Sequence, residues 1–181
     1  MLGVTVFFVL SGYLITGLLM AELEETGTVN LPQFWLRRVR RLFPAIVLVV
    51  VVVTALCVLF NHPLLTKLRP DVGPSLFWFQ NWWYVFRGLS YFESLGDPSP
   101  LTHFWSLAIE EQFYLVWPIL LLLVSKLGAS KNVIRRGCLV LAVISAALMW
   151  VLYNPLEDPT RVYYGTDTRA CSLLIGAWLS L

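Results

Sequence analysis

The sequence predicts an all-α fold: a polytopic transmembrane helix bundle with about four complete spans, one truncated span and a re-entrant or interfacial aromatic helix. Of the 181 residues, 58% are hydrophobic and 13% are charged, and this charged share is about half that of a soluble domain. The eight Trp, seven Tyr and eleven Phe residues fit a protein with two membrane–water interfaces, where amphipathic rings collect. The net charge of +2 is too small for a nucleic-acid-binding surface.

Runs of about 20 apolar residues mark the candidate spans. We expect spans near residues 1–21, 43–60, 104–125, 137–153 and 170–181, the last of them truncated. The chain begins inside one apolar run and ends inside another. We therefore expect residues 1–181 to be part of a larger membrane domain.

The basic residues predict the orientation of these spans. Arg37, Arg38, Arg40 and Arg41 lie between the first two spans, and Lys126, Lys131, Arg135 and Arg136 lie between the third and fourth. Cytoplasmic loops carry an excess of Lys and Arg, so both clusters are expected inside. The N-terminus, residues 61–103 and residues 154–169 are then expected outside.

Residues 76–86 form a short aromatic segment within the expected outer region. At about 1.5 Å per residue, these 11 residues reach only about half of the hydrocarbon core of about 30 Å. We therefore expect a re-entrant or interfacial helix. Gln80 and Asn81 in its middle indicate that it is partly buried in protein or faces water.

Residues 31–43 predict an amphipathic helix on the cytoplasmic surface, which Pro44 ends or kinks. Arg38 and Arg41 are three residues apart and share one face. Such a helix can anchor the topology and contact anionic lipids, and spacing alone favours this role. The alternative is a guanidinium cluster that binds phosphates, because arginine offers forked, permanently charged donors.

A second candidate site lies at the start of the third span. His103, Ser106, Glu110 and Tyr114 follow one another at steps of three and four residues, so they share one helix face, and Glu111 is turned about 100° away. Each carboxylate inside a membrane costs ~2.5–3.5 kcal/mol, so the pair must face a cavity or a cation. The pair is either functional or an ion pair between helices, in which Glu111 takes a cation such as Arg169.

Two further stretches contain polar residues near apolar runs. Asp167 and Arg169 flank Thr168 just before the last span. They can pair or reach inward, although spacing favours Asp167 or Thr168 as the N-cap of a helix that opens at Ala170. Ser11 and Gly12 lie in the middle of the first span, where we expect them to permit close helix packing. The sequence has no Cys/His ligand spacing, and we expect no metal.

Four stretches, in this order, resemble the acyltransferase 3 family of bacterial membrane O-acyltransferases: GVTVFFVLSGYLIT, FWLRRVRRLFPA, HFWSLAIEEQFYLVWP and YYGTDTRA. The resemblance implies transfer of an acyl group, commonly acetyl from cytoplasmic acetyl-CoA, to an extracytoplasmic glycan such as lipopolysaccharide, peptidoglycan or exopolysaccharide. It implies a multi-pass protein of the bacterial cytoplasmic (inner) membrane. The fourth stretch is most similar to members that often carry an SGNH-type domain outside the membrane, so such a domain is a candidate partner in the full-length protein.

The resemblance also implies roles for single residues. Arg38 and Arg41, with Arg37 beside them, match the motif that would bind acyl-CoA. Glu110, Glu111, Asp167 and Arg169 match the family's carboxylate pair and its Asp-x-Arg motif, and they are the expected catalytic residues. The family's first helix carries a proton-transfer histidine, and this chain starts at the equivalent of the second helix. His103 is the better placed of its two histidines to replace it, and we expect the chain alone to be inactive.

Two other classes of function remain open from the sequence. A proton-coupled transporter could also use intramembrane carboxylates as a relay. Acylation that depends on acyl-CoA, measured in vesicles against substrate flux, separates that class from an acyltransferase. The second alternative is a non-catalytic, truncated remnant.

Overall fold

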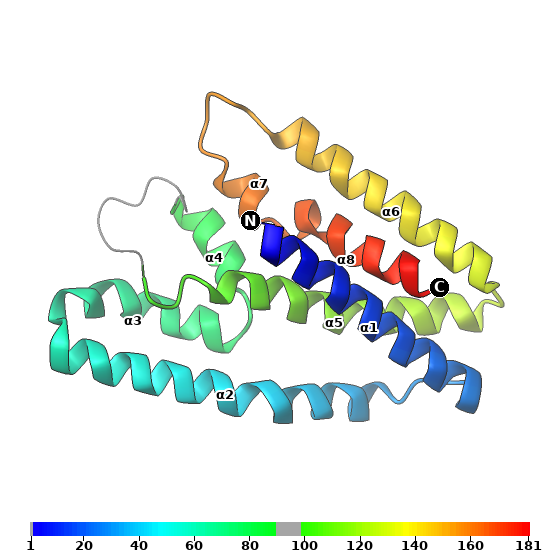
Figure 1. Cartoon of the computed structure of the whole chain (residues 1–181), viewed down its shortest axis with the longest axis horizontal. Coiled ribbons are helices and arrows are strands. Elements are labelled where there is room, and N and C mark those ends of the chain that lie inside the picture. Colours follow the sequence, from blue (N-terminus) through cyan, green and yellow to red (C-terminus); the bar gives the residue numbers. More distant parts are fainter. Residues whose placement is uncertain (1, 90–98) are drawn as a thin grey trace.

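A computed structural model describes residues 2–89 and 99–181, and the regular secondary structure of this part of the chain is all helix, without β-strands (Figure 1). The prediction of an all-α polytopic bundle is confirmed. The helices are α1 (Leu2–Thr26), α2 (Leu31–Phe60), α3 (His62–Leu76), α4 (Gln80–Arg87), α5 (Phe104–Lys126), α6 (Lys131–Leu152), α7 (Thr160–Tyr164) and α8 (Thr166–Ser180). Residue 1, with which the first expected span begins, lies outside the described residues.

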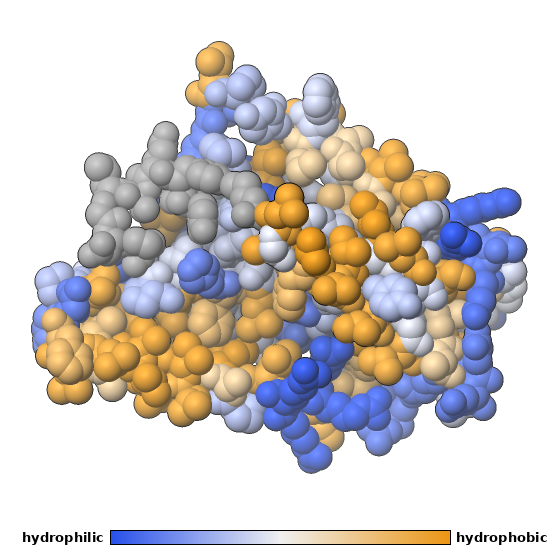
Figure 2. All heavy atoms as spheres, viewed as in Figure 1, coloured by the Kyte–Doolittle hydropathy of each residue, from blue (hydrophilic) through white to orange (hydrophobic). Residues whose placement is uncertain are grey.

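Four helices, α1, α2, α5 and α6, are long and apolar enough to cross a membrane. Large apolar side chains remain exposed along them, among them Leu48 and Val51 on α2 and Val140 and Val143 on α6. Figure 2 shows hydrophobic side chains over the part of α2 that leads to its C-terminal end, and hydrophilic side chains near its beginning. Such outward apolar faces suit lipid chains. The span limits in a bilayer stay a prediction.

The centre of the bundle is the packing of α1 against α8. A Cβ atom added at Gly12 of α1 would collide with the backbone of Leu173, and one added at Gly176 of α8 would collide with the backbone of Val9 and Tyr13. The two helices therefore touch backbone to backbone, which only glycine permits. This confirms the predicted close approach at Gly12. Helices α1, α5 and α8 run in the same direction, and α6 covers α8 from the other side (Figure 1).

One helix, α2, replaces the predicted amphipathic helix at 31–43 and the separate span at 43–60. Pro44 lies inside it, so of the two effects expected of Pro44, an end or a kink, the end of the helix is excluded. A proline removes one backbone hydrogen bond, but the apolar run that follows must satisfy its backbone groups internally, and the helix continues. At its start, the Asn30 side chain accepts a hydrogen bond of 3.2 Å from the backbone N–H of Gln33.

The helix expected at 76–86 is present but shorter than predicted, because α3 ends at Leu76 and α4 runs over Gln80–Arg87. Between them Trp78 has a positive φ of 55°, which interrupts the helical backbone. Helix α3 was not expected from the sequence. It folds back along α2, and the two pack through a buried cluster of Ile46, Val50, Cys57, Leu65 and Leu68, which Leu101 before α5 completes. Helices α3, α4 and α7 lie toward the same end of the bundle (Figure 1).

Helix α8 begins at Thr166, four residues before the expected start at Ala170. Its N-cap is Gly165, and no side chain caps it. Neither Asp167 nor Thr168 is the cap, and this interpretation is corrected. The Thr168 hydroxyl lies inside the first turn and donates to the carbonyls of Val162 and Gly165 at 2.8 and 2.9 Å. Those bonds hold α7 against the start of α8.

Candidate functional site

Three polar side chains meet between α1 and α5 in the interior of the bundle. The Ser11 hydroxyl donates to Oε1 of Glu110 at 2.5 Å, and the Tyr114 hydroxyl contacts both Ser11 and the same carboxylate oxygen. All three are buried, and Glu110 is only 6% exposed. We call these residues the Ser11–Glu110–Tyr114 cluster. It gives the intramembrane carboxylate the hydrogen-bond donors that burial requires.

Arg38 of α2 reaches the same cluster. Its guanidinium lies 4.1 Å from the centre of the Tyr114 ring, and the neighbouring Trp35 donates its indole N–H to the Tyr114 carbonyl at 3.1 Å. The predicted donor-binding arginine and the predicted catalytic carboxylate therefore contact the same tyrosine.

The other two expected acyl-CoA ligands lie farther out. Arg41 is exposed, three residues along α2 from Arg38. Arg37 is also exposed, and its guanidinium is 3.9 Å from the Glu22 carboxylate of α1. Both remain free to meet a ligand at the end of the bundle where α2 begins.

Glu111 is buried, 9% exposed, and its Oε1 atom has no hydrogen-bond partner in the part of the chain that the structure describes. Its electrostatic neighbours are the carboxylate of Glu110 and the guanidinium of Arg38. The expected ion pair with Arg169 is wrong: within residues 2–89 and 99–181, no ion pair joins these two side chains. The reason is the position of Arg169, which lies in the first turn of α8 and donates its Nε–H to the carbonyl of Tyr163.

His103 does not join Glu110. It is exposed at the N-terminal end of α5, and its carbonyl accepts a hydrogen bond from Ser106. Seven residues separate it from Glu110, about 10 Å along a helix. The four-residue face predicted from spacing is therefore only partly a site, because Glu110 and Tyr114 meet while His103 faces outward.

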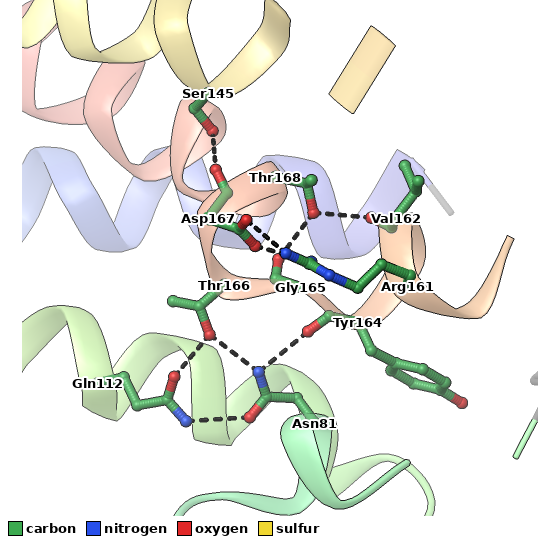
Figure 3. Close-up of polar contacts among 10 residues, drawn as sticks. All are labelled: Asn81, Gln112, Ser145, Arg161, Val162, Tyr164, Gly165, Thr166, Asp167 and Thr168. Atoms are coloured by element: carbon green, nitrogen blue, oxygen red, sulfur yellow. Dashed lines mark hydrogen bonds and ion pairs between the residues drawn. The ribbon is translucent and has the colours of Figure 1, made fainter. Parts of the chain in front are cut away.

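An amide network joins α4, α5 and α8 (Figure 3). The Asn81 side chain, fully buried, donates to the Tyr164 carbonyl and the Thr166 hydroxyl, both at 2.9 Å. Gln112 donates to Asn81 at 3.0 Å and accepts from Thr166 at 2.5 Å. Every polar atom of the Asn81 amide is thus paired within the protein, so the network fixes helices rather than binding a ligand.

Asp167 pairs with Arg161 and not with Arg169. Two nitrogens of the Arg161 guanidinium donate to the two carboxylate oxygens of Asp167 at 2.9 and 2.6 Å (Figure 3). This forked contact holds the pKa of the Asp167 carboxyl below its usual range. Arg169 instead donates its Nε–H to the Tyr163 carbonyl at 2.9 Å. The local Asp167–Arg169 pairing that the sequence allowed is therefore absent.

Sequence reasoning missed Ser11 and Arg161 as members of these sites. Ser11 was interpreted as a packing residue, because one hydroxyl in an apolar run gives no sign of a partner 99 residues away. Arg161 could have been found, because it is the nearest cation to Asp167 besides Arg169. In the described part of the chain, no three His, Cys, Asp or Glu side chains come together as a metal site.

A polytopic helix bundle with buried carboxylates beside an arginine defines an integral membrane protein with a polar interior site. Residues 1–181 match the sequence model of an acyltransferase domain, and the chain belongs to this acyltransferase family. It is 49% identical over 179 residues to the peptidoglycan O-acetyltransferase OatA of Listeria monocytogenes, covering 99% of this chain and 29% of the relative. It is 48% identical over 180 residues to the putative peptidoglycan O-acetyltransferase YrhL of Bacillus subtilis, covering 99% and 28%.

A putative O-acetyltransferase of Staphylococcus aureus, SACOL0978, is 41% identical over 181 residues, covering 99% of this chain and 30% of the relative. The chain thus spans less than a third of the length of these relatives. No solved structure matches the chain.

Proposed function

We propose that this chain takes part in O-acylation across a bacterial cytoplasmic membrane, in which an acetyl group moves from cytoplasmic acetyl-CoA to a hydroxyl of an extracytoplasmic glycan. Peptidoglycan is the first candidate acceptor, since the names of two relatives include it. The observation that carries the proposal is that Arg38 and Glu110 contact the same side chain, Tyr114. A cation for the donor and a carboxylate for the acceptor then lie close enough to serve one reaction.

The donor side of the proposed site is the beginning of α2. Arg38, Arg41 and Arg37 offer forked, permanently charged donors, which suit the phosphates of acyl-CoA. Arg41 and Arg37 are exposed at that end, where a large anionic ligand can reach them. Arg38 lies deeper, against Tyr114, and would bind the part of the donor nearest the reacting carbonyl.

Glu110 is the proposed general base. The acceptor hydroxyl oxygen attacks the thioester carbonyl, its proton passes to the Glu110 carboxylate, and the carbon–sulfur bond breaks. CoA leaves as the thiolate and then takes up a proton. General base catalysis contributes typically about 10²–10⁴-fold. His103 stays a candidate for proton exchange at the outer end, and Glu111, Asp167 and Arg169 stay candidates for shaping the site. An SGNH-type domain stays a candidate partner in the full-length protein.

Paired glutamate variants test the base. Glu110→Gln and Glu111→Gln are introduced in the gene, and acetyl transfer from labelled acetyl-CoA to peptidoglycan is measured in native membranes. Glu110→Gln should lower turnover by about 10²–10⁴-fold at an unchanged amount of protein, and Glu111→Gln should retain most of it. Loss of activity in Glu111→Gln with normal activity in Glu110→Gln would reverse the assignment.

Arginine variants test the donor side in the same assay. Arg38→Lys and Arg41→Lys keep the charge and lose the fork, so each should raise KM for acetyl-CoA more than it lowers kcat. Unchanged acetyl-CoA kinetics in both variants would exclude this donor site. Flux of a substrate without acylation would favour the transporter class instead.

A further inference from the structure

Only part of the Arg169 guanidinium has a hydrogen-bond partner in the described part of the protein. Its Nε–H donates to the Tyr163 carbonyl at 2.9 Å, and its guanidinium carbon lies 4.8 Å from the centre of the Tyr163 ring. Its two terminal nitrogens donate to no residue within 2–89 and 99–181, and no carboxylate of that part pairs with it. A guanidinium has five N–H donors in a fixed fork, so the outward half of the fork is unused.

The nearest acid in sequence is not available to Arg169. Asp167 gives both carboxylate oxygens to Arg161, at 2.9 and 2.6 Å. The two arginines of this region therefore differ in kind: Arg161 has a forked protein partner, and Arg169 has an aromatic face and a carbonyl. A partly buried cation without an anion loses hydration without compensation.

The side chain of Arg169 lines a small hollow at the end of the bundle where α1, α5 and α8 begin. The other lining residues are uncharged: Val4, Thr5, Phe8, Trp105 and Tyr163. The hollow admits a group of about the size of a water molecule or a carboxylate oxygen, and a sugar ring would have to stay outside it. By residue count it lies about 9 Å along α1 from Ser11, and so outward of the Ser11–Glu110–Tyr114 cluster.

We propose that this hollow is an anion subsite in which Arg169 binds a carboxylate of the glycan acceptor. A carboxylate is planar and matches the free edge of the guanidinium, and the hollow admits a group of about the size of one carboxylate oxygen. The inference rests on the proposed function and adds the chemical class of the acceptor: an acidic sugar, held by its carboxylate outward of Glu110. Neutral glycans would lack this contact.

The kinetic test compares two forms of one acceptor in membranes with labelled acetyl-CoA. One acceptor is an oligosaccharide with a free carboxylate, and the other is the same oligosaccharide as its methyl ester. The wild type should show a KM for the carboxylate form that is lower by on the order of ten- to a hundredfold, the range of one charge-assisted hydrogen bond. Arg169→Gln should raise only that KM, to the value of the ester, and Arg169→Lys should restore part of the preference.

Arg135→Gln is the matched control. Arg135 also lies 4.8 Å from an aromatic ring, that of Trp178, but on α6 near the opposite end of the bundle, and this variant should keep the preference. A wild type without preference, an Arg169→Gln variant that keeps it, or one that raises KM equally for both acceptors would overturn the anion subsite. Equal transfer to both acceptors would leave the proposed function standing.

A binding measurement decides the case in which no transfer is detected. The carboxylate oligosaccharide should raise the thermal unfolding midpoint of the purified wild type, and neither its ester nor inorganic phosphate should do so. Arg169→Gln should lose this shift while Arg135→Gln keeps it. An equal shift with the ester overturns the proposal, and a shift with phosphate alone overturns the choice of a carboxylate.

Discussion

Tyr114 has two chemically separate contacts. Its hydroxyl bonds to Glu110 and Ser11, whereas its ring lies under the Arg38 guanidinium at 4.1 Å. The hydroxyl therefore belongs to the proposed base, and the ring belongs to the proposed donor side. Substitutions that remove one contact at a time can separate the two.

Tyr114→Phe should lower kcat by on the order of tenfold and leave KM for acetyl-CoA unchanged, because the ring stays while a hydrogen bond to a charged group is lost. Tyr114→Leu should also raise KM for acetyl-CoA by a few-fold, since it removes a cation–π contact as well. Steady-state kinetics in native membranes measure both. Tyr13→Phe, which changes an exposed tyrosine of α1, is the control. A higher KM with an unchanged kcat in Tyr114→Phe would contradict this division.

Helices α1 and α8 depend on two glycines for their contact. The presence of a helix at α1 follows from its apolar composition, but its packing partner does not, because α8 begins only at Thr166, far along the chain. Gly12 and Gly176 explain why these two helices can pack together: neither residue has a Cβ atom, and a Cβ atom at either position would collide with the backbone of the other helix. Because the atoms that an added Cβ would meet are backbone atoms, a side-chain movement cannot relieve such a collision.

Gly176→Ala should therefore destabilise the protein by about 1–3 kcal/mol, the usual cost of overpacking. Gly137→Ala on α6 is the opposite case: the added Cβ meets nothing within 4 Å, and removing a helical glycine stabilises by roughly 0.5–1 kcal/mol. Thermal unfolding of the detergent-solubilised protein should show midpoints that move in opposite directions. Midpoints that both rise would show that α1 and α8 do not touch at Gly176.

The predictable elements are those whose signal is local. Spans such as α5 and α6 follow from apolar length, and Glu110 stands out because a carboxylate in such a run is costly. Helix α3 carries Pro70 and Pro74 and little apolar periodicity, so its helical state depends on packing along α2. The partners of Ser11 and Asn81 are contributed by helices far away in sequence, and no local pattern encodes them.

At the scale of the whole molecule, the two ends of the bundle differ in the side chains that they carry. Helices α2 and α6 begin toward one end of the bundle, and α3, α4 and α7 lie toward the other (Figure 1). Arginines of α2 and basic residues of α6 are near those starts, whereas the Arg169 hollow is lined by residues from the starts of α1, α5 and α8. This polarity agrees with the orientation predicted from Lys and Arg, in which the basic end is cytoplasmic. The orientation itself is a prediction that single cysteines can test.

Glu25→Cys and Leu127→Cys should react with an impermeant thiol reagent only from the cytoplasmic side, and Leu156→Cys only from outside. Leu127 is 85% exposed and Leu156 is 93% exposed, so both would be accessible to the reagent. The native Cys57 and Cys138 are buried and Cys171 is partly buried, which keeps the background low. Labelling of Leu156→Cys from the cytoplasm would show that the orientation of the bundle is the reverse of the predicted one.

The most direct test of the account is the sidedness of transfer in sealed vesicles of known orientation. Labelled acetyl-CoA is supplied on the cytoplasmic face, the glycan acceptor is enclosed on the other, and label on the glycan is measured for wild type, Glu110→Gln and Arg38→Lys. The account predicts transfer only in this arrangement. Glu110→Gln should give an amount of label on the glycan close to that of empty vesicles, and Arg38→Lys should regain transfer when acetyl-CoA is in excess. Transfer that requires donor and acceptor on the same face, or that both variants leave intact, would contradict it.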